Sequence, residues 1–368
     1  MIKDTIFSPS FGNRPSQLVG REELLDSLIE GLAQKPGSRE RAVVILGQHG
    51  GGKTVLLWEL ADRASEAGYV VARPTVASEG MLPRIIEKIQ DDGERYVKSE
   101  NGKTRVSGGS VGAFGFSAGL QFSRDAQDSK TFHYKLSHLA RTLTKQGRGI
   151  LVLVDELQAN SPDIRQLVTA YQEIVGEGLD IALVMAGLPG AVSATLNDKV
   201  LTFLNRARKV SLQALTTSEV DAYFSRAFDQ LGLKVPADLR TRAAKATCGS
   251  PYLLQLVGHN MVLYASEDGS VDEDSLGSAL ASAQSDFEND VCHTTLAALS
   301  EKDIEFLRAM ATDGEESGIS DIAQRMNVTP DYAQKYRRRL IESGVIEAAG
   351  RGRVRFAVPY LAGYLQRT

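Results

Sequence analysis

The segment that most constrains the fold is the eight-residue run GQHGGGKT at positions 47–54. It follows the apolar run AVVIL (42–46), which is typical of a strand buried on both faces of a parallel sheet. After it, apolar residues recur at helical spacing from Leu56 to Ala61. The run matches the pattern G-x-x-x-x-G-K-[S/T], in which backbone N–H groups surround phosphate oxygens at a helix N-terminus. The sequence therefore predicts a strand, a phosphate-binding loop and a helix.

This pattern assigns a role to each residue of the loop. Lys53 is expected to reach the β and γ phosphates of ATP, and the Thr54 hydroxyl to bind Mg²⁺. The predicted nucleotide ligands in the loop are Gly47, Gln48, His49, Gly50, Gly51, Gly52, Lys53 and Thr54.

Strand and helix patterns alternate after the loop up to residue 215. We predict strands at 69–72, 150–156, 181–187 and 208–215, and helices at 82–89, 130–146, 164–175 and 191–204. Alternation of this kind predicts parallel βαβ units, so residues 1–215 are expected to form an α/β core of the P-loop NTPase kind.

Glycine- and serine-rich residues 98–124 interrupt this alternation, with apolar side chains at every second position from Phe114 to Phe122. This pattern indicates an inserted β-hairpin at about 104–122. Two interpretations remain open: the hairpin covers an edge of the parent sheet, or it is an exposed surface that binds a partner.

Composition limits the wider possibilities. A chain of 368 residues with 42% apolar and 24% charged residues predicts two or three globular domains. The net charge of −4 indicates no overall basic surface, and we find neither a signal peptide nor an apolar run long enough to cross a membrane, so a cytoplasmic protein is expected. Cys248 and Cys292 lack metal-ligand spacing, and both are expected to be reduced and buried.

A second motif lies at the end of the predicted strand 150–156. The apolar run ILVLV is followed by Asp155 and Glu156, and the carboxyl ends of parallel strands are where such sheets bind ligands. Asp155 is expected to hold the Mg²⁺ shell together with Thr54. Glu156 is expected to polarise a water for attack on the γ-phosphate.

Together with LVGREELLDSL (18–28), these motifs resemble the ATPase core of the AAA+ and STAND superfamilies, of the origin-recognition and archaeal-ATPase kind. The resemblance covers about residues 15–297 and implies ATP and Mg²⁺ as cofactors, an adenine pocket at Val19 and Gly20, and a helical lid over 216–298. It also implies that Pro251 lies beside the nucleotide. Arg206, with Arg208 as substitute, falls where such ATPases often carry an arginine finger directed at a neighbouring subunit, which implies a homo-oligomer; an ordinary surface ion pair is the alternative.

Two departures from the AAA+ pattern concern the rate of hydrolysis. Strand 181–187 ends in Ala186 and Gly187, where many AAA+ proteins have a polar sensor residue, and no arginine stands beside Pro251. We therefore expect a slowly hydrolysing switch rather than a motor.

Residues 299–368 resemble a winged helix-turn-helix domain. Three short helical patterns precede two strand patterns around a Gly-Arg turn. Residues 335–355 contain seven basic and two acidic side chains, a net charge of +5, and we expect them to bind double-stranded DNA. The predicted DNA contacts are Lys335, Arg337, Arg338, Arg339, Arg351, Arg353 and Arg355. The alternative is an ATP-dependent signalling or assembly switch, in which this domain and the hairpin bind a protein partner.

Overall fold

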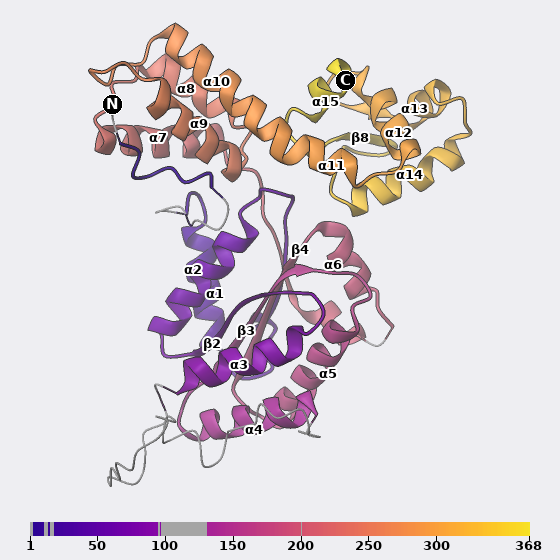
Figure 1. Cartoon of the computed structure of the whole chain (residues 1–368). Coiled ribbons are helices and arrows are strands. Elements are labelled where there is room, and N and C mark those ends of the chain that lie inside the picture. The colour runs from indigo at the N-terminus through magenta and orange to yellow at the C-terminus, as the bar shows by residue number, and fades with distance from the viewer. Residues whose placement is uncertain (1–2, 11–13, 15–17, 95, 97–130, 200) are drawn as a thin grey trace, which may run out of the picture.

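The computed structural model describes residues 3–10, 14, 18–94, 96, 131–199 and 201–368. A five-stranded, wholly parallel sheet forms the centre of the N-terminal region, in the order β2-β3-β4-β1-β5 (Figure 1). The strands are β1 (Ala42–Leu46), β2 (Val70–Val76), β3 (Ile150–Leu157), β4 (Ile181–Gly187) and β5 (Arg208–Ser211). The predicted α/β core of the P-loop NTPase kind is confirmed.

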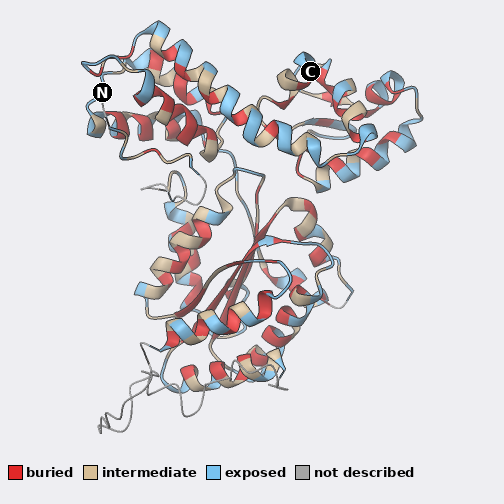
Figure 2. Ribbon diagram, viewed as in Figure 1, coloured by how far each residue is buried: buried red, intermediate tan, exposed pale blue. Residues whose placement is uncertain are grey.

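Helices cover both faces of this sheet, which is why the central strands are almost uniformly apolar (Figure 2). One face packs on α1 (Glu22–Leu32) and α2 (Lys53–Glu66). The other packs on α3 (Met81–Gly93), α4 (Phe132–Lys145) and α5 (Pro162–Gly176), together with α6 (Pro189–Leu196).

Three elements differ from the sequence-based prediction. The helix expected at 191–204 ends at Leu196, and a 3₁₀ helix, η2 (Thr202–Arg206), follows the Asn197-Asp198 turn. The strand expected at 208–215 ends at Ser211. Strand β2 extends to Val76, with a break in its pairing between Ala72 and Thr75, where Pro74 supplies no N–H group.

Four helices follow the sheet where a lid is predicted, and we call them the lid: α7 (Thr217–Leu231), α8 (Ala237–Ala246), α9 (Pro251–Tyr264) and α10 (Glu273–Phe287). A reciprocal capping box between Thr216 and Glu219 starts α7. The N-terminal segment, which the sequence assigns to the core, packs on the lid. The Phe7 ring contacts those of Tyr223, Phe224 and Phe228.

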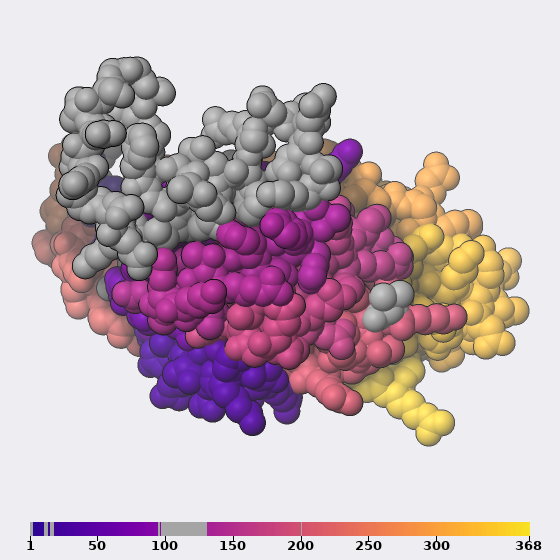
Figure 3. Space-filling model, turned by 90° about the horizontal axis from the view of Figure 1, so that it is seen from below, coloured from indigo at the N-terminus to yellow at the C-terminus, as the bar shows by residue number. Residues whose placement is uncertain are grey.

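A helical connection leads from the lid to residues 299–368, which we call the C-terminal module. It comprises the π-helical turn η3 (Glu288–His293) and α11 (Thr294–Ala297). The module contains α12 (Glu301–Ala311), β6 (Ser317–Gly318), α13 (Ile319–Arg325), α14 (Pro330–Glu342), β7 (Ile346–Ala348), β8 (Arg353–Phe356) and α15 (Leu361–Arg367). One continuous hydrophobic cluster joins the lid and the module. Seen from below, the module projects beside the core (Figure 3).

Three further expectations concern cysteines, the hairpin and membranes. Cys292 is buried, but Cys248 is exposed, because it lies at the left-handed turn between α8 and α9, so that part of the prediction is wrong. The hairpin expected at 104–122 lies outside the described residues. No helix in the described parts of the chain is long and apolar enough to cross a membrane.

Candidate nucleotide site

A cavity of about 1100 Å³ lies where the carboxyl ends of the strands meet the lid. Six of the eight predicted loop residues line it, whereas Gly47 and Gln48 do not. The six are His49, Gly50, Gly51, Gly52, Lys53 and Thr54. Asp155 and Glu156 line it from β3, and Pro251 lines it from α9. The structure therefore brings the two predicted motifs and the lid proline together around one space.

The loop needs glycine at two positions with left-handed backbone. Gly50 has φ +69° and Gly52 has φ +82°, a conformation that side chains with a Cβ rarely adopt. Gly52 is also the N-cap of α2 and provides no side-chain cap, so the first N–H groups of this helix remain open to an anion. Lys53 Nζ donates to the carbonyl oxygens of Gly47 (2.9 Å) and Gln48 (2.7 Å).

The second motif meets the loop through one short hydrogen bond. Thr54 Oγ1 donates to Asp155 Oδ2 at 2.6 Å, and Asp155 is buried. A hydroxyl and a carboxylate oxygen are suitable ligands for Mg²⁺, which takes few protein ligands and keeps waters and phosphate oxygens. These two residues would hold the ion, which would neutralise charge on the phosphates.

Glu156 has an unusual backbone. Its φ is +51°, and the pairing of β3 with β4 shifts register between Val154 and Leu157. A break of this kind redirects a side chain at the end of a strand. The Glu156 side chain is exposed and lines the cavity, although the strand continues to Leu157.

Burial affects the ionisation of the loop. It lowers the pKa of Lys53, although Asp155 and Glu156 act in the opposite direction. Burial, with a smaller contribution from the Lys53 charge, also lowers the pKa of His49. Both shifts favour the neutral form of the side chain.

The lid lies directly on the loop. Helix α9 begins at Pro251 with Ser250 as its N-cap, and a Cβ placed on Gly52 would lie 3.6 Å from the Pro251 ring. A Cβ on Gly50 would lie 3.3 Å from Tyr252. The loop and the start of α9 therefore lie close together.

Sequence reasoning missed two groups that line the cavity. Tyr252 donates to Asp290 Oδ2 at 2.6 Å, and Asp290 belongs to the π-helical turn that leads to the C-terminal module. Ser8–Ser10 line the cavity because Ser8 N donates to Gln255 Oε1 of the lid at 2.9 Å. Tyr252 adjoins Pro251, so the proline motif could have pointed to it. No comparable signal precedes Asp290 or Ser8.

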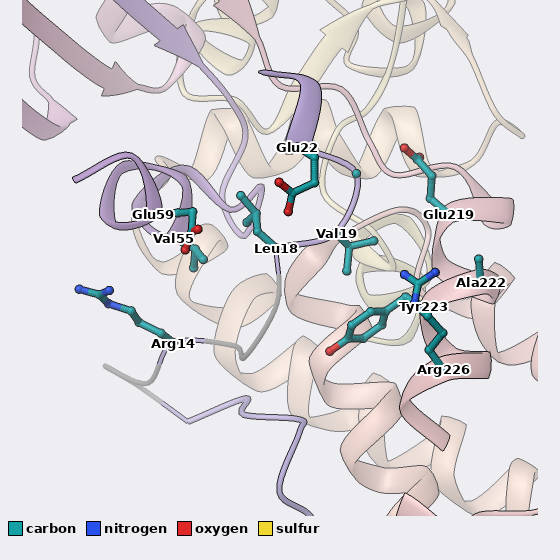
Figure 4. Close-up of a pocket in the computed structure, with 11 residues that line it drawn as sticks. Arg14, Leu18, Val19, Glu22, Val55, Glu59, Glu219, Ala222, Tyr223 and Arg226 are labelled. Carbon is teal, nitrogen blue, oxygen red and sulfur yellow. The ribbon is translucent and has the colours of Figure 1, made fainter. Parts of the chain in front are cut away.

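A smaller cavity of about 500 Å³ adjoins the first one, and Leu18 and Val19 line both. Figure 4 shows Val19 between Leu18 and Tyr223 of the lid. Gly20, which lines only the smaller cavity, has φ +65°, and a Cβ there would meet the Glu219 carboxylate at 2.7 Å. The predicted adenine-binding segment thus lies at the junction of the two cavities.

The two arginine-finger candidates differ in their surroundings. Arg208 donates to Ser27 Oγ at 2.8 Å and pairs with Glu40 at 3.2 Å, so it has a structural role in this chain. Arg206 is exposed in η2 and forms no ion pair within the described residues. Neither side chain lines the nucleotide cavity of its own chain.

The seven basic residues of the module also divide into groups. Arg339 pairs with the buried Asp303 and donates to Ser300 Oγ; Arg353 pairs with Glu316 and Arg355 with Glu347. Arg337 is half-buried, and its Nε has no hydrogen-bond partner among the described atoms. The side chains that are exposed and form no ion pair within the described residues are Lys335, Arg338 and Arg351.

Comparison with known proteins agrees with this geometry. Residues 17–184 match the AAA ATPase domain family, and residues 289–365 match a domain of unknown function, DUF8462. The α/β core is therefore a P-loop ATPase domain of the AAA+ type. No curated protein sequence matches the chain.

Solved structures share the fold across nearly the whole length. The Walker-type ATPase PABY2304 of Pyrococcus abyssi superposes with a TM-score of 0.70 at 16% identity, covering 96% of this chain and 97% of that one. The Aeropyrum pernix ORC2 protein in its ADPNP-ADP complexes gives a TM-score of 0.64 at 19% identity, covering 98% and 95%. At these identities the likeness concerns the fold alone.

Proposed function

We propose that the protein is an ATP-binding, slowly hydrolysing ATPase that acts as a nucleotide-dependent switch. The observation that carries this proposal is the convergence of Lys53, Thr54 and Asp155 in one cavity beneath the lid. Val19 and Gly20 would contact the adenine, and Pro251 would border the phosphates. The similar fold of A. pernix ORC2, solved with ADPNP and ADP, supports a nucleotide in this place.

Hydrolysis would follow from the same arrangement. Glu156 accepts a proton from a water whose oxygen bonds to the γ-phosphorus, while the bond to the β–γ bridging oxygen breaks and ADP leaves. Lys53 stabilises the charge on the phosphates, and Mg²⁺, which Thr54 and Asp155 would hold, would supply further positive charge. Ala186 and Gly187 provide no polar side chain at the end of β4, which is consistent with slow turnover.

We further propose that the C-terminal module is a winged helix-turn-helix domain that binds double-stranded DNA. Its helices α12, α13 and α14 followed by the β7–β8 hairpin have the order of that fold. Lys335 and Arg338 lie on one exposed face of α14, and Arg351 lies at the hairpin turn. A helix face for the major groove and a hairpin for the phosphates would thus both carry unpaired cations.

The test is a fluorescence-anisotropy titration of duplex DNA with the protein bound to ATP, to ADP and to no nucleotide. We expect salt-sensitive binding whose affinity differs between nucleotide states. Nucleotide-dependent assembly without DNA affinity would contradict the DNA proposal and favour a protein partner. The internal pairing of Arg339, Arg353 and Arg355 is the observation that favours this second candidate.

Arg206 supports a third part of the proposal, assembly of several copies. Because it is exposed and unpaired in the described structure and lies outside its own cavity, it would act on the γ-phosphate of a neighbouring subunit. The expected result for Arg206→Ala is lost stimulation of turnover at high protein concentration with unchanged ATP affinity. Stimulation equal to that of wild type would exclude this role.

A further inference from the structure

The C-terminal end of α14 is seated directly on the ATPase core. Gly190 lies buried in the first turn of α6, and a Cβ placed on it would overlap the backbone of Glu342. Figure 1 shows α14 of the module beside α6 of the core, and the two helices are in contact. Only glycine at position 190 permits this approach.

The next turn of the chain reaches the phosphate loop itself. A Cβ placed on Gly344 would overlap Oε1 of Gln48, and it would lie 3.5 Å from Cδ2 of Leu188. Gln48 Oε1 is buried and has no hydrogen-bond partner among the described residues. The turn after α14 therefore encloses the Gln48 side chain by packing and not through a hydrogen bond.

The backbone of Gln48 is tied to the resting position of Lys53. Its carbonyl accepts from Lys53 Nζ at 2.7 Å and from Gly51 N at 3.1 Å. Together with the bond to the Gly47 carbonyl, this leaves one N–H donor of Lys53 for a phosphate oxygen, so a second phosphate contact requires Lys53 to release one carbonyl. Gln48 therefore takes part both in the contact with the module and in the hydrogen bond that holds Lys53.

We propose that the C-terminal module is a latch on the phosphate loop. The Glu342–Gly190 and Gly344–Gln48 contacts stabilise the loop in its resting state, and phosphate binding releases the module. By linkage, the latch lowers nucleotide affinity to the same extent that nucleotide weakens the latch.

The latch would also affect the affinity of the module for DNA, and this step rests on the proposed function. Lys335, Arg338 and Glu342 share the exposed face of α14, and the Glu342 end of this face lies on α6. A duplex that follows the face along its whole length meets α6 unless the module is released. Nucleotide binding would therefore increase DNA affinity.

The test uses Gly190→Ala in the full-length protein, with Gly277→Ala as the matched control. Both are glycine-to-alanine changes within helices, but a Cβ on Gly277 meets nothing within 4 Å. We expect Gly190→Ala to bind ATPγS at least about fivefold more tightly than the control, within the usual range of allosteric coupling. Small-angle scattering should give Gly190→Ala a larger radius of gyration without nucleotide, and wild type should reach it only with nucleotide.

Equal ATPγS affinity and equal radius of gyration for Gly190→Ala and Gly277→Ala would overturn the latch, and so would weaker binding by Gly190→Ala. If no variant binds ATPγS, the proposed function fails; binding by the control with no gain in Gly190→Ala refutes the latch alone. If Gly190→Ala does not fold, Leu188→Ala, which removes the side chain against Gly344, should show the same larger radius, and an unchanged radius overturns the proposal.

Discussion

The nucleotide cavity and the C-terminal module differ in how distance along the sequence relates to distance in the structure. At the cavity, Lys53, Thr54 and Asp155 converge although about 100 residues separate the loop from Asp155, because parallel strands end at the same edge. In the module, seven cations close in sequence have separate surroundings, and three of them are paired internally. A motif tied to backbone geometry therefore predicts a site better than a local excess of charge does.

The largest effect is expected for Lys53, because phosphate binding in the cavity depends on its charge. Lys53→Ala should weaken ATP binding by at least about 100-fold, since it removes the half-buried lysine of the loop that is expected to contact the phosphates. Isothermal titration calorimetry measures the change, with the exposed Lys145→Ala as control. Unchanged affinity in Lys53→Ala would remove the basis of the nucleotide site.

Glu156 separates binding from chemistry within the same cavity. Glu156→Gln should keep ATP affinity but slow turnover by about 10²–10⁴-fold, because the amide cannot accept the proton of the attacking water. Phosphate release measures turnover, and the exposed Glu87→Gln on α3 is the control. If Glu156→Gln turns over as fast as this control, another group is the base.

In the module, the division of the cations can be tested by charge reversal. Lys335→Glu, Arg338→Glu and Arg351→Glu together should weaken duplex DNA binding by about tenfold or more and reduce the salt slope by about one per lost phosphate contact. Reversal of Arg353 and Arg355 should have a smaller effect, since each already has a carboxylate partner. A larger loss from the paired arginines would contradict the assignment of the free cations to DNA.

Much of the α/β core could be predicted because its signals are local. The bounds of β1 and β4 agree with the apolar runs, and the P-loop follows β1 as its pattern requires. The missed features depend on contacts between distant segments: Phe7 against the lid, Tyr252 with Asp290, and Gly344 on Gln48. No periodicity or motif encodes such pairs, since each partner alone looks like an ordinary core, polar or turn residue.

The smallest expected effect concerns the free energy of unfolding, which burial of the Lys53 charge in the cavity lowers. Because burial lowers the folded-state pKa of Lys53 below its ordinary value of 10.5, the unfolded chain binds more protons between these two pKa values. The free energy of unfolding contributed by Lys53 therefore rises with pH across the range just below 10.5, by up to about 1.4 kcal/mol per pKa unit. Urea unfolding of wild type and Lys53→Met at pH 8 and pH 10 measures the contribution of Lys53. The contributions of the other titratable groups cancel when the free energies of unfolding of the two proteins are subtracted. Lys53→Met should be the more stable protein at pH 8, with the gap narrowing at pH 10. A stability difference that does not narrow would show that burial of the Lys53 charge does not lower the stability of the protein.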